Sequence, residues 1–281
     1  GINMQNYSRQ FKGIFGVEKG SGNILVTADY STLEIRIACS MMGEANMYEA
    51  LMRGDDIHKY AASLIYNKPI EDIVGRERSN AKVANFGFLY GMSATTFVGY
   101  AFDLYGLKFT FKEADALRNK WMKAFPAVEA YHNKVGKLLR RGGYICETAL
   151  GYRIKPRMYT DAINAPTQGT GGECGRLAIH LMVKKDKRTL DYMRNFIHDA
   201  FYLITPESEA KYWGALLEEG MLEAWAEISK SKHFKYRDIP MMADVAYGYS
   251  MTDLADDFDG GGQALNMVEM REELAKQGKT L

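Results

Sequence analysis

The hydrophobic positions of the first half of this chain indicate one buried strand followed by a largely helical region. Residues 24–28 are apolar and partly β-branched, and they follow the turn-forming residues 20–23, which is typical of a buried strand. The strand leads into Asp29, and a helical pattern continues from there through Ser40. Further helices are predicted at residues 56–67, 76–90, 94–104, 111–124 and 127–140, the last two being separated by Pro126.

The second half mixes strand and helix patterns. A hairpin is predicted at residues 144–155, and the run 194–205 reads as two strands that meet at a tight turn. The remaining elements are predicted as helices at 166–184 and 207–228, a strand at 241–249, a flexible glycine joint at 260–262 and a charged helix at 265–276. Strands at both ends with helices inserted between them predict an α+β fold.

Composition narrows the class of protein. The chain has 281 residues, of which 47% are hydrophobic, enough for one large domain or two closely associated ones. With 36 basic and 35 acidic residues the net charge is only +1, so any attraction to phosphate has to come from local clusters. The three cysteines form no CxxC pair, which argues against a disulfide framework or a structural zinc site. No apolar run reaches the ~20 residues of a membrane span, and no signal-peptide pattern is seen.

Two acidic residues stand where strands are predicted to end. Asp29 follows the first apolar strand, and its plainest alternative role is a helix N-cap. His198 and Asp199 interrupt an apolar segment, where burial would cost several kcal/mol, so a tight turn that exposes them is expected; an ordinary hairpin turn is the alternative. Two carboxylates on rigid strands can together bind two divalent metal ions ~4 Å apart and support phosphoryl transfer.

A second candidate lies in the helix at 76–90. Arg78, Lys82, Phe86 and Tyr90 recur every four residues, and since each step drifts by ~40° they form a slowly winding stripe on one face. The two cations suit a triphosphate, and the two rings suit a base or a sugar. The alternative is a solvated basic end followed by a buried aromatic end.

The segment 164–172 combines amide side chains with glycines. Asn164 and Gln168 can hydrogen-bond to bases or sugars, and the glycines allow a close approach of the backbone. The segment is neither a dinucleotide-binding fingerprint nor a P-loop, because Cys174 stands where a third glycine would fall and no Gly-Lys-Ser/Thr follows. Small residues that permit close helix packing are the alternative reading.

The order and spacing of these segments resemble family A DNA polymerases. The segments around Asp29, Arg78 to Gly91 and His198-Asp199 resemble motifs A, B and C, and residues 3–6, 56–58 and 164–170 resemble further segments in the expected order. The resemblance implies an antiparallel palm sheet with a large helical fingers insertion, in a DNA polymerase I-like right-hand architecture lacking the thumb. The implied domains are the palm at 1–55 and 161–258, the fingers at 56–160, and a joint with a helical tail at 259–281.

The resemblance also implies residue roles. Asp29, Asp199 and the Tyr30 main-chain carbonyl would ligate two Mg²⁺ ions, and Lys82 would protonate pyrophosphate. Glu34, hydrogen-bonded to Tyr90, would exclude the ribose 2′-hydroxyl. The other substrate contacts implied are Arg78 and Lys82 with the triphosphate, Phe86 beside the sugar, where phenylalanine implies discrimination against dideoxynucleotides, and His58 near the β-phosphate. The DNA contacts implied are Gln168, Asn164, His198 and Asn6.

The function implied is a template-directed DNA polymerase module that adds dNTPs to a primer. Its expected partners are primer-template DNA and an upstream chain supplying thumb and exonuclease, since no proofreading exonuclease is encoded in this chain. The tail helix is a candidate docking site for that partner. A bacterial or phage-infected cytoplasm is expected, with an organelle left open.

The chain departs from the family pattern at several positions. Ala200 stands where a glutamate commonly follows the motif C aspartate, Thr32 replaces a glutamine, Thr160 replaces an arginine, and the connection 144–163 is short. A binding or assembly module that keeps the fold without catalysis is therefore an alternative. RNA synthesis is a second alternative, which Glu34 disfavours.

Overall fold

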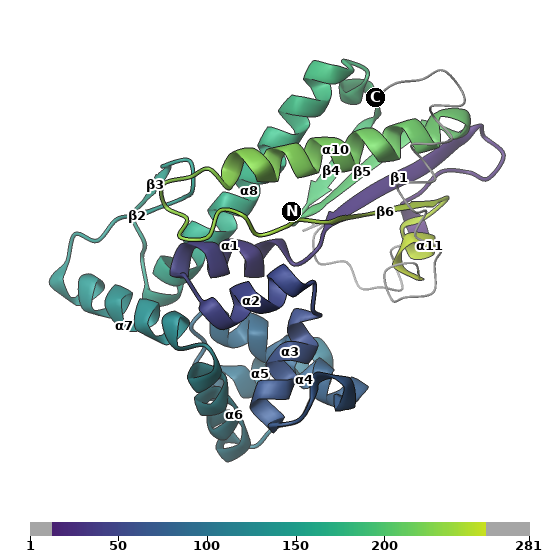
Figure 1. The fold of residues 1–281 in the computed structure, drawn as a ribbon. Helices are drawn as coiled ribbons and strands as arrows, with labels where there is room; N and C mark the ends of the chain where they lie inside the picture. Colours follow the sequence, from purple (N-terminus) through teal and green to yellow (C-terminus); the bar gives the residue numbers. More distant parts are fainter. Residues whose placement is uncertain (1–12, 257–281) are drawn as a thin grey trace. The chain divides into compact units, whose positions relative to one another are not determined.

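The computed structural model describes residues 13–256, which divide into two compact units (Figure 1). Within these residues, the first unit contains the chain up to Leu33, Gly171–Ile228 and the segment from Met241, while the second contains Glu34–Thr170 and Ser229–Pro240. The antiparallel sheet with a long helical insertion confirms the predicted α+β fold. None of the described helices is long and apolar enough to cross a membrane. The palm and fingers boundaries stay predictions, and Asn6 and the 265–276 helix lie outside the described residues.

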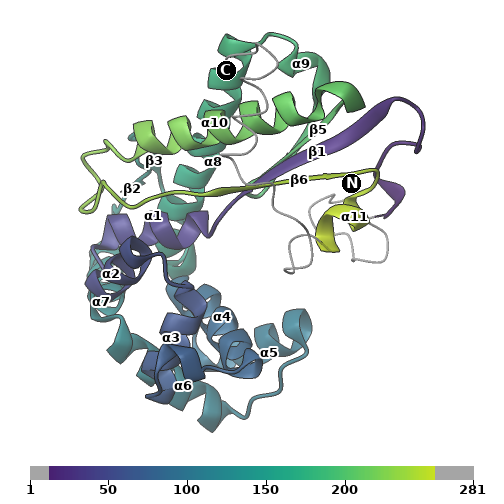
Figure 2. The same cartoon turned by 45° about the vertical axis from the view of Figure 1, so that its right-hand side comes forward.

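The first unit is built on a four-stranded antiparallel sheet of order β4-β5-β1-β6. Residues 25–28 and Tyr30 of β1 are buried, and the Tyr30 hydroxyl donates to the Met221 carbonyl of α10 at 2.9 Å. Helix α10 thus covers one face of the sheet (Figures 1 and 2), while the side chain of Asp29 belongs to the other face. The elements are β1 (Asn23–Tyr30), β4 (Met193–Ile197), β5 (Ala200–Pro206), β6 (Ala243–Gly248), α9 (Thr189–Tyr192), a 3₁₀ turn (Glu207–Glu209), α10 (Ala210–Ile228) and α11 (Met251–Asp256).

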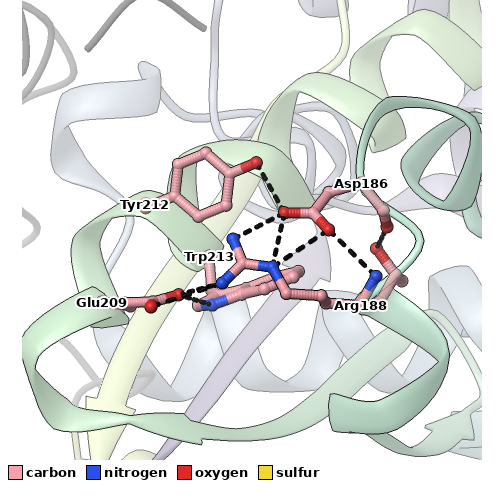
Figure 3. Close-up of polar contacts among 6 residues, drawn as sticks. Asp186, Arg188, Glu209, Tyr212 and Trp213 are labelled. Carbon is pink, nitrogen blue, oxygen red and sulfur yellow. Dashed lines mark hydrogen bonds and ion pairs between the residues drawn. The ribbon is translucent and has the colours of Figure 1, made fainter.

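A polar cluster around Arg188 ties the segment after α8 to the start of α10 (Figure 3). The guanidinium lies between two carboxylates, 2.7 Å from Asp186 and 3.0 Å from Glu209. It also lies over the Trp213 ring, 5.2 Å from its centroid, and the Trp213 indole N–H donates to Glu209 at 3.1 Å. The Arg188 guanidinium therefore contacts two carboxylates and one aromatic ring at once, so we assign it a structural role.

We expect Arg188→Ala to lower the free energy of unfolding by about 1–2 kcal/mol, because half-exposed ion pairs contribute up to about 1 kcal/mol and a cation–π contact a similar amount. Urea unfolding of the two proteins measures the difference. Lys187→Ala is the matched control, since the side chain of Lys187 is exposed and only its backbone carbonyl accepts a hydrogen bond, from Leu190, within the described chain. Equal stability of the Arg188 and Lys187 variants would contradict the prediction.

The second unit is mainly helical. Its aromatic core joins α4, α5 and α6 through Phe88, Phe97 and Trp121, with Phe125 beside them, all fully buried. Helix α1 begins at Leu33 of the first unit, and α8 contributes residues to both. The elements are α1 (Leu33–Met42), α2 (Ala45–Arg53), α3 (Ile57–Tyr66), a 3₁₀ turn (Ile70–Asp72), α4 (Gly75–Leu89), α5 (Ala94–Tyr105), α6 (Phe111–Ala124), α7 (Pro126–Arg141), β2 (Cys146–Glu147), β3 (Arg153–Ile154) and α8 (Tyr159–Lys185).

Several helices differ from the sequence-based prediction, and the short helices α9 and α11 were not predicted. Helix α2 was not predicted, although it ends at Gly54 in the left-handed conformation that favours glycine. Helix α8 begins at Tyr159 rather than at Pro166, because Ala162 and Ile163 bury their side chains against α7, and this burial outweighs the backbone hydrogen bond that Pro166 removes.

Candidate active site

Asp29 and Asp199 lie together at one end of the sheet. Asp29 pairs with Ala200 across β1 and β5, and the preceding residue, Asp199, occupies the two-residue turn between β4 and β5. The backbone N–H of Tyr30 donates to the Asp199 carbonyl at 3.2 Å, which fixes the turn against the end of β1. Folding therefore brings together two acids that are far apart in the sequence, as predicted.

The turn itself is unusual in its first residue. His198 has φ 57°, in the left-handed region that a two-residue hairpin turn requires and that histidine enters more readily than most residues. His198 and Asp199 line a cavity of about 450 Å³ on the face of the sheet opposite α10. Asp29, Arg194 and Asn195 also line this cavity, so it offers both acidic and basic groups to a ligand.

Burial and mutual repulsion make the acid pair electrostatically costly. Burial raises the pKa of Asp29, and the nearby charge of Asp199 raises it further; burial also raises the pKa of Asp199. Oδ1 of Asp29 is buried and has no hydrogen-bond partner within residues 13–256. Carboxylate oxygens are the ligands that Mg²⁺ prefers. The unsatisfied Oδ1 of Asp29, beside the carboxylate of Asp199, therefore fits a divalent cation.

A third acid, Asp244, was missed from the sequence. It lies on β6 directly opposite Asp29, so the row across the sheet runs Ala200, Asp29, Asp244. Its charge is a further, smaller cause of the raised pKa of Asp29. Within the described chain, no three His, Cys, Asp or Glu side chains are grouped closely enough to hold a metal ion. Asp244 is therefore a neighbour of the Asp29–Asp199 pair and not a third member of one metal-binding group. Only the register of β1 and β6 could have identified it.

The side chain and main chain of Tyr30 have different surroundings. The ring is buried against α10, and its hydroxyl contacts Met221 and Cys174. The side chain therefore has a structural part in the first unit. The metal-binding role predicted for Tyr30 concerns only its main-chain carbonyl.

In the second unit, α4 carries the predicted stripe. Lys82 is exposed, whereas Arg78, Phe86 and Tyr90 are half-buried. The Nε–H of Arg78 donates to Asp56 at 2.6 Å, and the Tyr90 hydroxyl donates to Glu34. The hydrogen bond expected between Glu34 and Tyr90 is thus present, while the steric role of Glu34 stays a prediction.

A buried polar chain links three helices behind this stripe. The Trp121 indole N–H donates to Asn85 Oδ1 at 2.7 Å, and Asn85 Nδ2 is 2.9 Å from Nδ1 of His58. Since indole can only donate, the Asn85 oxygen must face Trp121 and its amide N–H must face His58. His58 therefore carries its proton on Nε2, and burial lowers its pKa to about 4, so it is neutral at pH 7.

The segment 164–172 forms part of α8. Gln168 is exposed, whereas Oδ1 of Asn164 is buried without a hydrogen-bond partner in the described chain. A Cβ at Gly169 would lie 2.7 Å from a methyl group of Thr148, so this glycine permits close packing of the helix. The packing interpretation thus holds for Gly169, and the DNA contacts of Asn164 and Gln168 stay predictions.

The junction between β1 and α1 is strained at Thr32. Its φ is 51°, which is a genuine outlier for a β-branched residue. We expect Thr32→Asn to raise the free energy of unfolding by about 0.5–1 kcal/mol, because asparagine tolerates this conformation. Urea unfolding measures the change. Thr95→Asn, at an exposed helical position of α5, is the control and should give no gain; a loss of stability in Thr32→Asn would contradict the strain.

Comparisons with known proteins point to one family. The model of the family described as "DNA polymerase family A" matches residues 2–253. DNA polymerase I of Aquifex aeolicus is 36% identical over 231 residues, which are 81% of this chain and 40% of that protein. Thermostable DNA polymerase I of Thermus thermophilus is 30% identical over 217 residues, 73% of this chain and 25% of that protein. The chain thus spans two fifths or less of these two relatives.

A solved structure is similar over most of the fold. It is the POL domain of Pol1 from M. smegmatis in complex with DNA primer-template and dNTP. It aligns with a TM-score of 0.72 and 26% identity, covering 90% of this chain and 45% of that chain.

Proposed function

The chain belongs to DNA polymerase family A, and on this premise we propose that it is the palm and fingers portion of an enzyme that adds dNTPs to the 3′ end of a primer under the direction of a template. The observation that carries the proposal is the meeting of Asp29 and Asp199 at the end of the sheet. The first unit would supply most of the palm and the second most of the fingers. The cytoplasm of a bacterial or phage-infected cell is the proposed location.

The acid pair is the proposed metal centre. Asp29, Asp199 and the main-chain carbonyl of Tyr30 would hold two Mg²⁺ ions. When bound, the ions would activate the primer hydroxyl and stabilise the charge on the leaving oxygen. The unsatisfied Oδ1 of Asp29 and the raised pKa of both carboxyls support this assignment, because a divalent cation relieves repulsion between the acids. The chain keeps the two carboxylates rigid through the strand pairing described above.

The basic end of α4 is proposed to hold the triphosphate. Arg78 would bind it through its guanidinium, and Lys82 would bind it and give a proton to the pyrophosphate as it leaves. The exposure of Lys82 in this structure supports access to a ligand. His58 would donate from Nε2 toward the β-phosphate as a neutral imidazole, which the tautomer imposed by Asn85 supports.

The aromatic end of α4 is proposed to hold the sugar. Phe86 would lie beside the deoxyribose and disfavour dideoxynucleotides. Tyr90 holds the carboxylate of Glu34 by a hydrogen bond, and this carboxylate would occupy the space that a 2′-hydroxyl needs. Primer-template DNA would be contacted by Asn164, Gln168 and His198, and by Asn6 in the segment before the described residues.

Primer extension tests the proposal. The chain is incubated with a labelled primer-template, Mg²⁺ and dNTPs, alone and with the product of a neighbouring reading frame as the proposed upstream partner. We expect extension that follows the template and requires both Mg²⁺ and the matching dNTP. Folded protein that binds dNTPs but extends no primer in either setting would refute catalysis and favour the alternative of a binding module. Faster incorporation of NTPs than dNTPs would favour RNA synthesis.

A further inference from the structure

Asp56 has two separate hydrogen-bonding tasks, one for each carboxylate oxygen. Oδ1 accepts from the backbone N–H groups of His58 and Lys59, at 2.9 and 3.0 Å, and so caps the N-terminus of α3. Oδ2 accepts from the Arg78 Nε–H at 2.6 Å. The cap needs only one oxygen, so the contact with Arg78 is an addition to the capping role.

Asp56 contacts Arg78 through Nε, the guanidinium nitrogen nearest to the aliphatic part of the side chain. Only Nε is used, and within residues 13–256 the terminal Nη1 and Nη2 groups make no hydrogen bond. Those two groups form the end of the planar fork that binds phosphate in a bidentate manner. Asp56 therefore orients the side chain and leaves its phosphate-binding end available.

Asp56 has two opposite effects on the binding of a triphosphate by Arg78, one through orientation and one through charge. The carboxylate of Asp56 neutralises part of the cation, which weakens attraction to a triphosphate. However, both groups are partly exposed, 38% for Arg78 and 33% for Asp56, so solvent screens the charge effect. Arginine loses much rotamer freedom when it binds, and a side chain already held by Nε has lost part of it beforehand. We therefore expect the orienting effect to dominate.

We propose that Asp56 is a positioning residue for nucleotide binding: it fixes α3 through one oxygen and aims the guanidinium of Arg78 at the triphosphate through the other. The inference rests on the proposed function, since it assigns a role to a residue that supports the triphosphate-binding arginine. It goes beyond the substrate contacts assigned above, in which Asp56 has no part.

Calorimetric titration with dATP in the presence of Mg²⁺ tests the proposal on the full chain. Asp56→Asn keeps a good N-cap but loses the charged acceptor for Arg78. We expect its Kd for dATP to rise about tenfold, equal to about 1.4 kcal/mol. In an Arg78→Ala background the same substitution should change Kd little, because its effect passes through Arg78. In primer extension, KM should rise with a smaller change in kcat.

A matched control comes from the same turn of α4. Glu77 accepts from Lys68 and from the backbone N–H of Val74, and Glu77→Gln removes a charge there without touching Arg78. Its Kd for dATP should equal that of the wild type. Thermal unfolding checks that each variant is folded, and Asp56→Ser, which keeps a capping hydroxyl too short to reach Arg78, replaces any variant that is not.

The outcomes distinguish failure of the positioning role of Asp56 from failure of the proposed polymerase function. A wild-type Kd in Asp56→Asn, or an equal loss with and without Arg78, overturns the positioning role and leaves the polymerase proposal untouched. Wild-type protein that binds no dATP overturns the proposed function itself, and the positioning role with it.

Discussion

Asp29→Asn is expected to reduce primer extension by at least about 10³-fold, equivalent to roughly 4 kcal/mol of transition-state stabilisation. Asparagine has nearly the same shape as aspartate but carries no charge, so it keeps the strand and removes the charge that is proposed to bind metal. Asp199→Asn should have a similar effect, because the two carboxylates meet at the same point. Single-turnover extension at saturating dNTP measures the loss.

The same substitution should stabilise the metal-free protein at neutral pH. The pKa of Asp29 is raised above its ordinary value of 3.8 in the folded state, so the folded protein binds more protons than the unfolded chain above that pH. Wild-type stability therefore falls as pH rises from about 4 toward the folded pKa, and Asp29→Asn removes this loss, which is of the order of a few kcal/mol. Thermal unfolding in EDTA from pH 4 to pH 8 measures both curves.

Controls separate charge at the site from charge elsewhere. Asp103→Asn, at an exposed position of α5, removes an acid outside the site and should leave primer extension unchanged. Added Mg²⁺ should raise the melting temperature of the wild type more than that of Asp29→Asn. Full extension by Asp29→Asn, or a lower stability than the wild type at pH 8 in EDTA, would contradict the assignment of the acid pair.

Glu34→Ala is expected to weaken the exclusion of ribonucleotides by roughly 10²-fold or more, since a pocket discriminates poorly against an added hydroxyl once nothing blocks it. Glu34 lies in the first turn of α1, and the Tyr90 hydroxyl holds its carboxylate in place. The ratio of kcat/KM for dATP to that for ATP, measured on one primer-template, gives the change.

Tyr90→Phe is the matched variant, because it removes the hydroxyl that holds Glu34 and leaves the ring. It should relax the discrimination less than Glu34→Ala does, since the carboxylate is still present but less firmly held. A dATP to ATP ratio that stays at the wild-type value in Glu34→Ala would exclude the steric role, whatever the overall activity.

The sequence by itself determined which segments are helices and strands where the signal is local. The apolar run before Asp29 became β1, the interruption at His198-Asp199 became the turn between β4 and β5, and the helix predicted at 94–104 became α5. A strand or a helix turn involves residues close in sequence, so the period of apolar positions and the capping residues are sufficient to identify it.

Local patterns were misleading where distant contacts outweighed them. Pro166 marks a favourable helix start, yet α8 begins earlier because Ala162 and Ile163 pack against Val135 of α7. The cost of a proline inside the helix is local, whereas the gain from burial depends on a partner that the sequence near Pro166 does not reveal.

The site shows the same division. Asp29, Asp199 and the α4 stripe were candidates from residue type and spacing, and the contact between Glu34 and Tyr90 was expected from the family resemblance, but the acids Asp244 and Asp56 were not assigned to the site. Asp244 lies opposite Asp29 only through the register of β1 and β6, and Asp56 meets Arg78 only through the packing of α3 on α4. Register and helix packing are fixed by burial summed over whole faces, so the tertiary structure alone decided that Asp244 lies beside Asp29 and that Asp56 contacts Arg78.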